Sequence, residues 1–323
     1  MEMLSRVIRL IGLAGVLLIA GFAVFVATRQ NLRFDPPLPA VSASADSAVI
    51  ARGRYLVRTA ADCGSCHGDP ALAGEDAGEI PLSGGNAWHL PPGVFRAPNI
   101  TPDPATGIGA ASDGAIARAL RHGVGIDGRA LLPFMEMQGL ADDDLTAIVS
   151  YLRTQAPVVH AVPPHGYNLL GRVVRATVLA NPIGPAEPPP AVAPRDIGIE
   201  TGRYLAGSVS NCWACHTERS PSTGELLGPR YGGARFMPGG GADTVWAPPN
   251  LTPDPRTGRL MQLGLTEDGF VERMRAGPLL PGSPMPWDVY RRMTEGDLRS
   301  IYRFLMSLPP LENDVGPAVR VGT

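Results

Sequence analysis

The sequence contains no lysine, and its 28 basic residues are all arginine. With 30 acidic residues the net charge is −2, and the chain has no run of like charges. Proteins that bind nucleic acid usually carry a basic patch, so this composition argues against such a partner. Aromatic residues make up only 6% of the chain, whereas 34 prolines and 39 glycines together exceed a fifth of it. We therefore expect small domains with long Pro/Gly-rich loops.

Cysteine is also scarce, and its four occurrences follow one pattern. CGSCH occupies residues 63–67, and CWACH occupies residues 212–216. C-x-x-C-H is the attachment signature of c-type haem. The two thiols can form thioethers with the haem vinyl groups, and the adjacent histidine can bind the iron. The pattern predicts two covalently bound haem c groups, with the attachment residues Cys63, Cys66, His67, Cys212, Cys215 and His216.

A structural zinc site is the alternative for paired C-x-x-C motifs, because four thiolates can bind one zinc ion. The two cysteine pairs lie too far apart in the sequence for a zinc ribbon, and each has its own histidine. Haem is therefore the favoured interpretation of both motifs.

One long apolar run lies near the N-terminus. Residues 10–27 (LIGLAGVLLIAGFAVFVA) carry no charge, and a helix of this length is close to the thickness of the membrane hydrocarbon. Arg6 and Arg9 precede the run, which favours a cytoplasmic N-terminus and an exported remainder. A cleaved signal peptide is the competing interpretation, but the nearest A-x-A-like site, at residues 43–45, lies well downstream. We expect an uncleaved membrane anchor.

The rest of the chain is a tandem repeat, because the same landmarks occur twice in the same order. They are GRYL at 53–56 and 202–205, C-x-x-C-H, N-[IL]-T-P-D-P-x-T-G at 99–107 and 250–258, and a D-L…[YF]-L pattern at 144–152 and 297–305.

Helical spacing of apolar residues in each repeat predicts an all-α fold. We expect a first helix at 48–61 and a last helix at 142–154, and equivalents at 200–208 and 295–308. Gly53 and Gly202 should let the first helix approach the last closely, with Tyr151 or Phe304 in the crossing. The predicted organisation is a membrane anchor at 1–28, a flexible tether at 29–46, a first domain at 47–156, a Pro-rich linker at 157–195, a second domain at 196–310 and a tail at 311–323.

Methionine on the opposite haem face would complete the iron coordination and raise the reduction potential. In the second repeat, Met285 stands between two prolines, which hold a loop rigid. In the first repeat, Met135 follows Pro-Phe, while Met137 lies at nearly the same distance from the haem motif. The Pro-x-Met context favours Met135, although spacing alone does not separate the two.

Several other residues have simpler interpretations. His160 and His165 lie in the linker and should be exposed. Asn99 and Asn250 match the N-x-S/T glycosylation pattern. We interpret them as loop structure that shapes the haem edge.

The combination of these motifs resembles class I c-type cytochromes. More narrowly, it is similar to the membrane-anchored cytochrome c subunits of bacterial periplasmic alcohol, gluconate or aldehyde dehydrogenases. The resemblance spans about residues 47–310 and implies two tandem class I cytochrome c domains, whereas that subunit family commonly has three haem domains. It carries over Cys63, Cys66, His67 and Met135 to the first site, and Cys212, Cys215, His216 and Met285 to the second.

The resulting expectation is a dihaem c-type cytochrome that transfers electrons and is not itself an enzyme. A single helix would anchor it in the bacterial inner membrane, with its haem domains in the periplasm. Electrons would pass from a partner dehydrogenase to a downstream cytochrome, quinone or oxidase. The alternative is a dihaem peroxidase or oxidase with one open iron, which requires a first domain without a distal methionine. Met135 argues against it. A sensor or docking module ranks last, because the chain shows no output domain.

Overall fold

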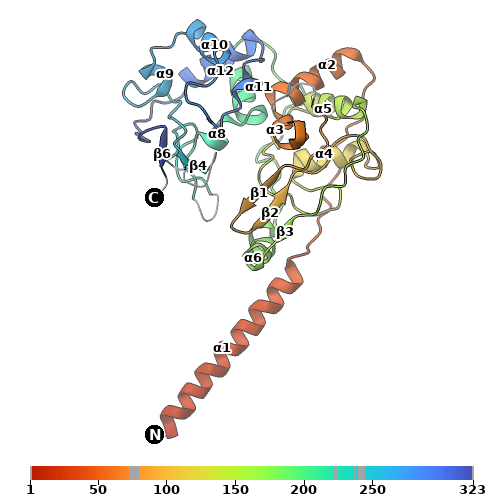
Figure 1. The fold of residues 1–323 in the computed structure, drawn as a ribbon, viewed down its shortest axis with the longest axis vertical. Coiled ribbons are helices and arrows are strands. Elements are labelled where there is room, and N and C mark those ends of the chain that lie inside the picture. The colour runs from red at the N-terminus through yellow and green to blue at the C-terminus, as the bar shows by residue number, and fades with distance from the viewer. Residues whose placement is uncertain (1, 73–79, 221–224, 236, 239–243, 322–323) are drawn as a thin grey trace.

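The computed structural model describes residues 2–72, 80–220, 225–235, 237–238 and 244–321. A long N-terminal helix, α1 (Glu2–Arg29), projects from a body made of two halves (Figure 1). Helices are the main regular elements of the body, as the sequence predicts. The prolines and glycines lie largely in the loops between its short helices.

The first half begins with α2 (Ser47–Tyr55), which is capped by the Asp46 carboxylate and runs without a break into the π-helical turn η1 (Leu56–Ala60). Its last helix is α5 (Asp142–Thr154), whose first turn carries three aspartates that complement the helix dipole. The elements between them are α3 (Cys63–His67), η2 (Pro70–Leu72), β1 (Ala87–Leu90), β2 (Gly93–Arg96) and α4 (Asp113–His122).

The second half follows the same general order, with additional short helices. It starts with α7 (Ile199–Tyr204) and the π-helical turn η4 (Leu205–Val209), and it ends with α12 (Glu295–Met306). The elements between them are α8 (Cys212–Cys215), β4 (Met237–Pro238), β5 (Thr244–Trp246), α9 (Arg259–Gln262), α10 (Glu267–Arg275) and α11 (Trp287–Tyr290).

Two glycines allow the first and last helices of each half to touch. A Cβ atom on Gly53 would lie 1.9 Å from the Ala147 carbonyl oxygen and 2.7 Å from the Tyr151 Cβ atom. On Gly202 it would lie 1.9 Å from the Ser300 carbonyl oxygen. Any side chain at either glycine would therefore push the helices apart, and the predicted close approach is confirmed.

The structure also contains short strands, which the all-α prediction does not include. Within the described residues they form two three-stranded antiparallel sheets, in the orders β1-β2-β3 and β4-β5-β6. The third strand of each sheet is β3 (Gly166–Tyr167) or β6 (Val319–Val321). These strands come from the predicted linker and tail, so each of those segments completes the half that precedes it. Strands of two to four residues give too little alternation to be recognised in a sequence.

The segment between α1 and α2 is bound to the first half rather than free. The Phe34 amide donates to the Gly128 carbonyl at 2.7 Å, and the Ala43 amide donates to the Asp113 carboxylate at 2.7 Å. The Val41 side chain is buried. The prediction of a flexible tether is wrong here, because its polar residues do not reveal these long-range partners.

The linker likewise packs on the first half. It contains a short helix, α6 (Leu169–Thr177), followed by η3 (Val178–Ala180). His160 is half-buried, and its Nδ1 lies 3.0 Å from the Ser83 carbonyl oxygen, so its predicted exposure is wrong. His165 is exposed as expected, with its ring against Phe95 and Tyr167.

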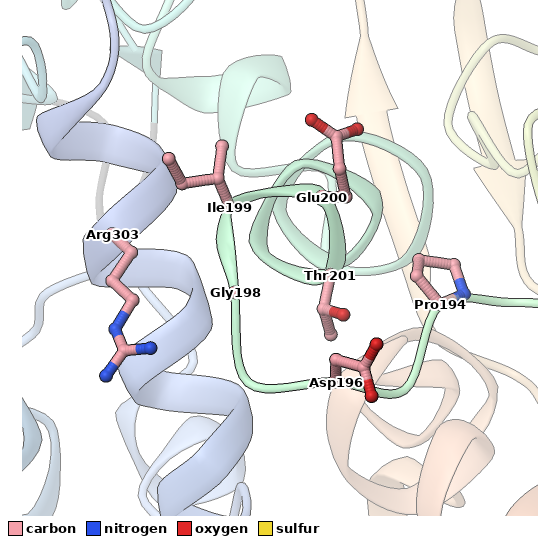
Figure 2. A pocket seen from close by; sticks show the side chains of 7 residues that line it. All are labelled: Pro194, Asp196, Gly198, Ile199, Glu200, Thr201 and Arg303. Atoms are coloured by element: carbon pink, nitrogen blue, oxygen red, sulfur yellow. The ribbon is translucent and has the colours of Figure 1, made fainter.

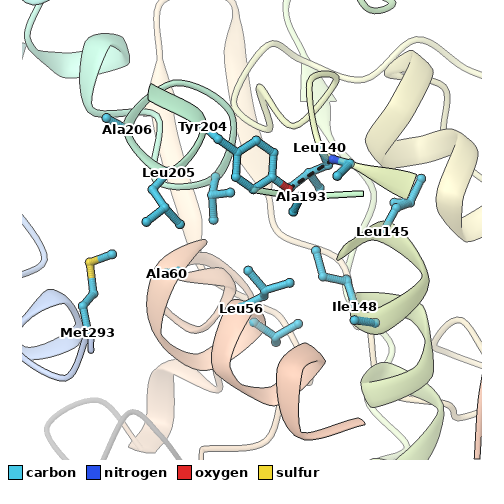
Figure 3. Packing of buried hydrophobic residues seen from close by; sticks show 14 of the residues in the cluster. Leu56, Ala60, Leu140, Leu145, Ile148, Ala193, Tyr204, Leu205, Ala206 and Met293 are labelled. Carbon is cyan, nitrogen blue, oxygen red and sulfur yellow. Dashed lines mark hydrogen bonds between the residues drawn. The ribbon is translucent and has the colours of Figure 1, made fainter. Parts of the chain in front are cut away.

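The two halves share one hydrophobic core. Leu56 and Ala60 from the first half belong to the same buried cluster as Tyr204, Leu205 and Met293 from the second (Figure 3). The turns η1 and η4, which immediately precede the two cysteine motifs, contact each other. The motifs are therefore held on one continuous packed body.

Candidate functional site

Each C-x-x-C-H motif begins with a sharp bend of the backbone. The residue before the first cysteine, Asp62 or Asn211, has φ 48°, in the left-handed region that, apart from glycine, asparagine and aspartate adopt most readily. Asp62 also accepts hydrogen bonds from the Ser65 amide at 3.3 Å and from the Ser65 hydroxyl at 2.7 Å. The π-helical turn followed by this bend presents both cysteines of a motif in one short helical turn.

The two histidines are oriented by backbone carbonyl groups. His67 Nδ1 lies 2.9 Å from the Pro98 oxygen, and His216 Nδ1 lies 2.8 Å from the Pro249 oxygen. A carbonyl oxygen only accepts, so Nδ1 carries the proton and Nε2 keeps its lone pair. Burial lowers the pKa of both imidazoles. The neutral ring with a free Nε2 is the form that binds a metal, and the hydrogen bond at Nδ1 fixes its direction.

The N-[IL]-T-P loops hold these two prolines in place. Asn99 Nδ2 donates to the Val158 carbonyl at 2.8 Å, and its Oδ1 accepts from the Thr101 amide at 2.9 Å. Asn250 makes the same contacts, with the Leu311 carbonyl at 2.6 Å and the Thr252 amide at 2.9 Å. Both asparagines are buried. Their amides are therefore structural, as the sequence predicts, and are inaccessible to a glycosyl transferase.

The second motif opens into an apolar cavity. Cys212, Cys215 and His216 line it together with Met285, which approaches from the rigid Pro-Met-Pro loop. Most of the remaining wall is apolar, including Trp246, Leu251, Leu260, Phe270 and Leu305.

This donor set fits a haem. Two thiols stand on the wall where they could form thioethers, and the imidazole and the thioether that line the same cavity are of the types that could bind a haem iron. The apolar wall suits the porphyrin face. The described residues contain no cluster of three or more His, Cys, Asp or Glu side chains that could hold a separate metal ion.

The loop that carries Met135 and Met137 faces the second half. Asn211 Nδ2 donates to the Met137 sulfur at 3.8 Å, so the Met137 thioether already has a partner across the interface. Glu136 forms an ion pair with Arg219, at 3.2 Å. Met135 lies in the same loop and is half-buried. The contact of Met137 favours Met135 as the remaining candidate for the first site.

Sequence reasoning missed the proline carbonyls and the contacts that fix the motif turns. Asn86 Nδ2, for example, donates to the Cys66 and Gly68 carbonyls, each at 2.9 Å. Pro98 and Pro249 could have been found, because each directly precedes the repeated asparagine. Asn86 lies in no repeated motif, so the sequence gives no comparable signal for it.

A surface pocket at the start of α7 is a separate feature (Figure 2). Its lining residues include Asp196, Glu200 and Arg303 but no cysteine, histidine or methionine. Arg303 already donates to Glu267 at 2.8 Å and to the Ile197 carbonyl at 2.9 Å. This pocket therefore has no evident role in haem binding.

The interface between the halves contains a reciprocal pair of contacts. The Tyr204 hydroxyl donates to Asp144 at 2.8 Å and accepts from the Ala141 amide at 3.1 Å. Tyr55 donates to Asp297 and accepts from the Thr294 amide at 3.2 Å. Each tyrosine comes from a GRYL segment, and each acceptor lies at the start of the last helix of the other half. The two repeats are thus docked on one another in an approximately two-fold manner.

Comparison with known proteins gives one family and several relatives. The family described as Cytochrome c matches residues 50–156. A diheme cytochrome c-type protein of Cereibacter sphaeroides is 32% identical over 93% of this chain and 98% of its own length. A nicotinate dehydrogenase component from Pseudomonas putida is 30% identical over 92% of this chain. The cytochrome c subunit of a quinone alcohol dehydrogenase from Gluconacetobacter polyoxogenes is 30% identical over 84% of it.

The lengths of these relatives differ. The chain spans 24% of the nicotinate dehydrogenase component and 58% of the alcohol dehydrogenase subunit, but nearly the whole of the diheme protein. The match to the dehydrogenase subunits is therefore a match to part of each.

Proposed function

This chain belongs to the cytochrome c family, and we propose that it is a dihaem electron carrier in which each C-x-x-C-H turn holds one covalent haem c. Two tandem cytochrome c domains, at residues 47–156 and 196–310, would each carry one haem. The repeat of the π-helical turn, the cysteine motif, the proline carbonyl and the asparagine loop supports this proposal for the second half as well as for the half that the family match covers.

The observation that carries the proposal is the cavity in the second half, where two thiols, an imidazole and a thioether line one largely apolar wall. A haem bound there would supply an iron that cycles between two oxidation states. Cys212 and Cys215 would fix its edge, while His216 and Met285 would hold its two faces. The histidine–proline hydrogen bond keeps the imidazole in one orientation, and the apolar wall excludes water. Such a site passes electrons without binding a substrate to the metal.

For the first site, Cys63, Cys66 and His67 are the corresponding residues, and Met135 is the proposed sixth ligand. The contact of Met137 with Asn211 supports this choice. The shared core and the contact between η1 and η4 place the two attachment segments on adjacent parts of one packed body. That arrangement suits electron transfer between two haems.

The proposed location is the bacterial inner membrane, with α1 as a single-pass anchor and the body in the periplasm. The helix is apolar enough and long enough to cross a bilayer. Its C-terminal end also packs against α6, and Arg29 Nε donates to the Ala176 carbonyl at 3.3 Å. This contact supports a retained helix, because cleavage would remove part of the folded body.

The proposed partners are a dehydrogenase that supplies electrons and a cytochrome, quinone or oxidase that accepts them. The names of two relatives, which belong to dehydrogenases, support the donor class. The net charge near zero and the absence of a basic run in the sequence argue against a nucleic acid as a partner.

Spectroscopy of the purified full-length protein tests the proposal. A pyridine haemochrome assay should give two haems c per chain. The spectrum of the dithionite-reduced protein should stay unchanged when carbon monoxide is added, because both irons are closed by protein ligands. A shift affecting about half of the haem would instead show an open iron and favour the dihaem peroxidase or oxidase.

A further inference from the structure

Helix α6 is amphipathic, but part of its apolar face is turned outward. Leu169 is 77% exposed, Leu170 is 51% exposed, and Val178, just after the helix, is 56% exposed. The buried positions of the helix are instead the small residues Gly171 and Ala176. A surface helix of a water-soluble protein packs its apolar stripe against the core. Here the two leucines and Val178 are exposed, whereas Val173 and Val174 are half-buried.

The small-residue side of α6 is fixed firmly to the body. A Cβ atom on Gly171 would lie 2.2 Å from the Pro92 carbonyl oxygen, so the helix backbone touches the β1–β2 turn directly. The N-cap Asn168 accepts from the Gly171 amide at 3.0 Å and donates to the Pro91 carbonyl at 2.8 Å. Rotation of the helix to bury its leucines would break these contacts. The outward apolar face is therefore built into the fold.

The position of α6 along α1 identifies what this face meets. The Ala176 carbonyl accepts from Arg29, which lies two residues, or roughly 3 Å of helix rise, beyond the end of the apolar run at Ala27. Figure 1 shows α6 at the end of the body from which α1 projects. If α1 crosses the bilayer, α6 lies at the level of the lipid headgroups, on the membrane surface that faces the body.

The charges near α6 suit that level. Arg172 is on the helix, and the Arg175 guanidinium lies over the Tyr167 ring, 4.7 Å from its centroid. Arg29 lies beside them at the end of α1. Interfacial helices typically combine an apolar face with arginines or lysines that meet anionic headgroups.

We infer that α6 is a second membrane contact, an interfacial helix whose Leu169, Leu170 and Val178 enter the lipid surface beside the anchor. It would fix the orientation of the body on the membrane, whereas a single helix would leave the body free to tilt. The inference rests on the proposed anchoring by α1, and its occupant is the lipid surface rather than a protein.

Thiol accessibility in a bilayer tests it. Full-length, haem-loaded protein carrying Leu170→Cys would be placed in nanodiscs of phosphatidylcholine and phosphatidylglycerol. Met261→Cys on α9 is the matched control, because Met261 is 42% exposed and lies in the other half. Each variant is treated with a membrane-impermeant charged maleimide or with the lipid-soluble N-cyclohexylmaleimide, and modification is followed by peptide mass spectrometry.

The expected result is selective protection at residue 170. Its thiol should react severalfold more slowly than that of the control with the charged reagent, but readily with the lipid-soluble one. Fast reaction with both reagents would place the face in water and overturn the inference. Slow reaction with both would mean that protein covers it, which also overturns the inference. In either case the anchor proposal survives if the chain elutes with the nanodiscs. A chain that does not elute with the nanodiscs would overturn both the anchor proposal and this inference.

A second set of variants tests the cause of the protection. Leu169→Gln with Val178→Gln should raise the reaction rate of the Leu170→Cys thiol with the charged maleimide toward that of the control. Leu169→Ile with Val178→Ile keeps the face apolar and should leave the rate low. Equal rates in the two double variants would show that the apolar face does not hold the helix in lipid.

Discussion

The two halves make the same tyrosine-to-aspartate contact across their interface, but they surround the two aspartates differently. Asp144 is fully buried and binds Arg52 at 2.8 Å and Arg195 at 2.9 Å. Asp297 is half-buried and contacts Tyr55. In the second half, Thr201 stands where the first half has Arg52. The two halves therefore share the geometry of the docking contact, but the ion pairs with arginine are formed at Asp144.

The methionine loops differ in a related way. In the second half, Met285 lies between two prolines and lines the cavity of its own half. In the first half, the loop at 135–139 touches the second half through Met137 and Glu136. The loop of the proposed first iron ligand therefore contacts the other half through its own residues, whereas Met285 lies in the cavity wall of its own half. The predictions below use this contrast.

The largest expected effect is the loss of one haem. Replacing Cys212 and Cys215 by alanine should remove the covalent haem of the second half and leave one haem per chain, because both thioether bonds are lost. Replacing Cys63 and Cys66 should remove the other. Haem staining of denatured protein and the haemochrome assay measure this. Two haems per chain in either double variant would contradict the assignment.

Met285→Ala should open one iron. Loss of the thioether ligand should lower the potential of that haem by an amount on the order of 0.1 V and let carbon monoxide bind to it. Met135→Ala should do the same at the other site. Met137→Ala is the matched control and should leave both irons closed. A redox titration with and without carbon monoxide distinguishes these outcomes, and an unchanged titration of Met285→Ala would remove Met285 as a ligand.

Asp144→Asn should destabilise the protein by about 3–5 kcal/mol, because it leaves Arg52 at the interface without its buried carboxylate. Asp297→Asn should cost only about 1 kcal/mol, since it weakens one hydrogen bond. Thermal unfolding, followed by calorimetry in detergent, measures both. Equal losses would show that the arginines around Asp144 do not strengthen the interface.

Replacing the glycine at the helix crossing should reduce the stability of the protein by a similar amount in the two halves. Gly53→Ala and Gly202→Ala each place a methyl group 1.9 Å from a carbonyl oxygen, so each should cost about 1–3 kcal/mol. Gly198→Ala is a suitable control, because a Cβ atom there meets nothing within 4 Å. A midpoint unchanged from that of the control would contradict the close approach of the helices.

The smallest effect concerns acid stability. Burial raises the pKa of Asp144, but its hydrogen bond and charge interaction with Arg52 and the charge of Arg195 outweigh this, so the pKa is lowered. A carboxylate with a lowered pKa stabilises the fold above its unfolded pKa, near 4, and this contribution is lost as the pH falls through the folded pKa. As the pH is lowered below about 4, the midpoint temperature of unfolding should decrease more steeply in the natural protein than in Asp144→Asn. Parallel curves would exclude this contribution.

Much of the site could be predicted from the sequence because its chemistry is local. C-x-x-C-H places two thiols and an imidazole within one turn, so the attachment residues need no distant partner to be recognised. The repeat likewise indicated which helices would cross, since Gly53 and Gly202 stand at equivalent positions. The strands and the bound segment at 30–46 could not be predicted, because each depends on hydrogen bonds to residues far away in the chain.

The sequence by itself therefore determined the cofactor chemistry, the repeat and the apolar N-terminal helix, each of which is carried by adjacent residues or by regular spacing. Only the tertiary structure decided how the halves dock through Tyr55 and Tyr204, that Asn211 engages Met137, and that α6 faces outward beside α1. The physical reason is the range of the interactions. Helix formation and ligand spacing act over a few residues, whereas an interface is set by side chains that only folding brings together.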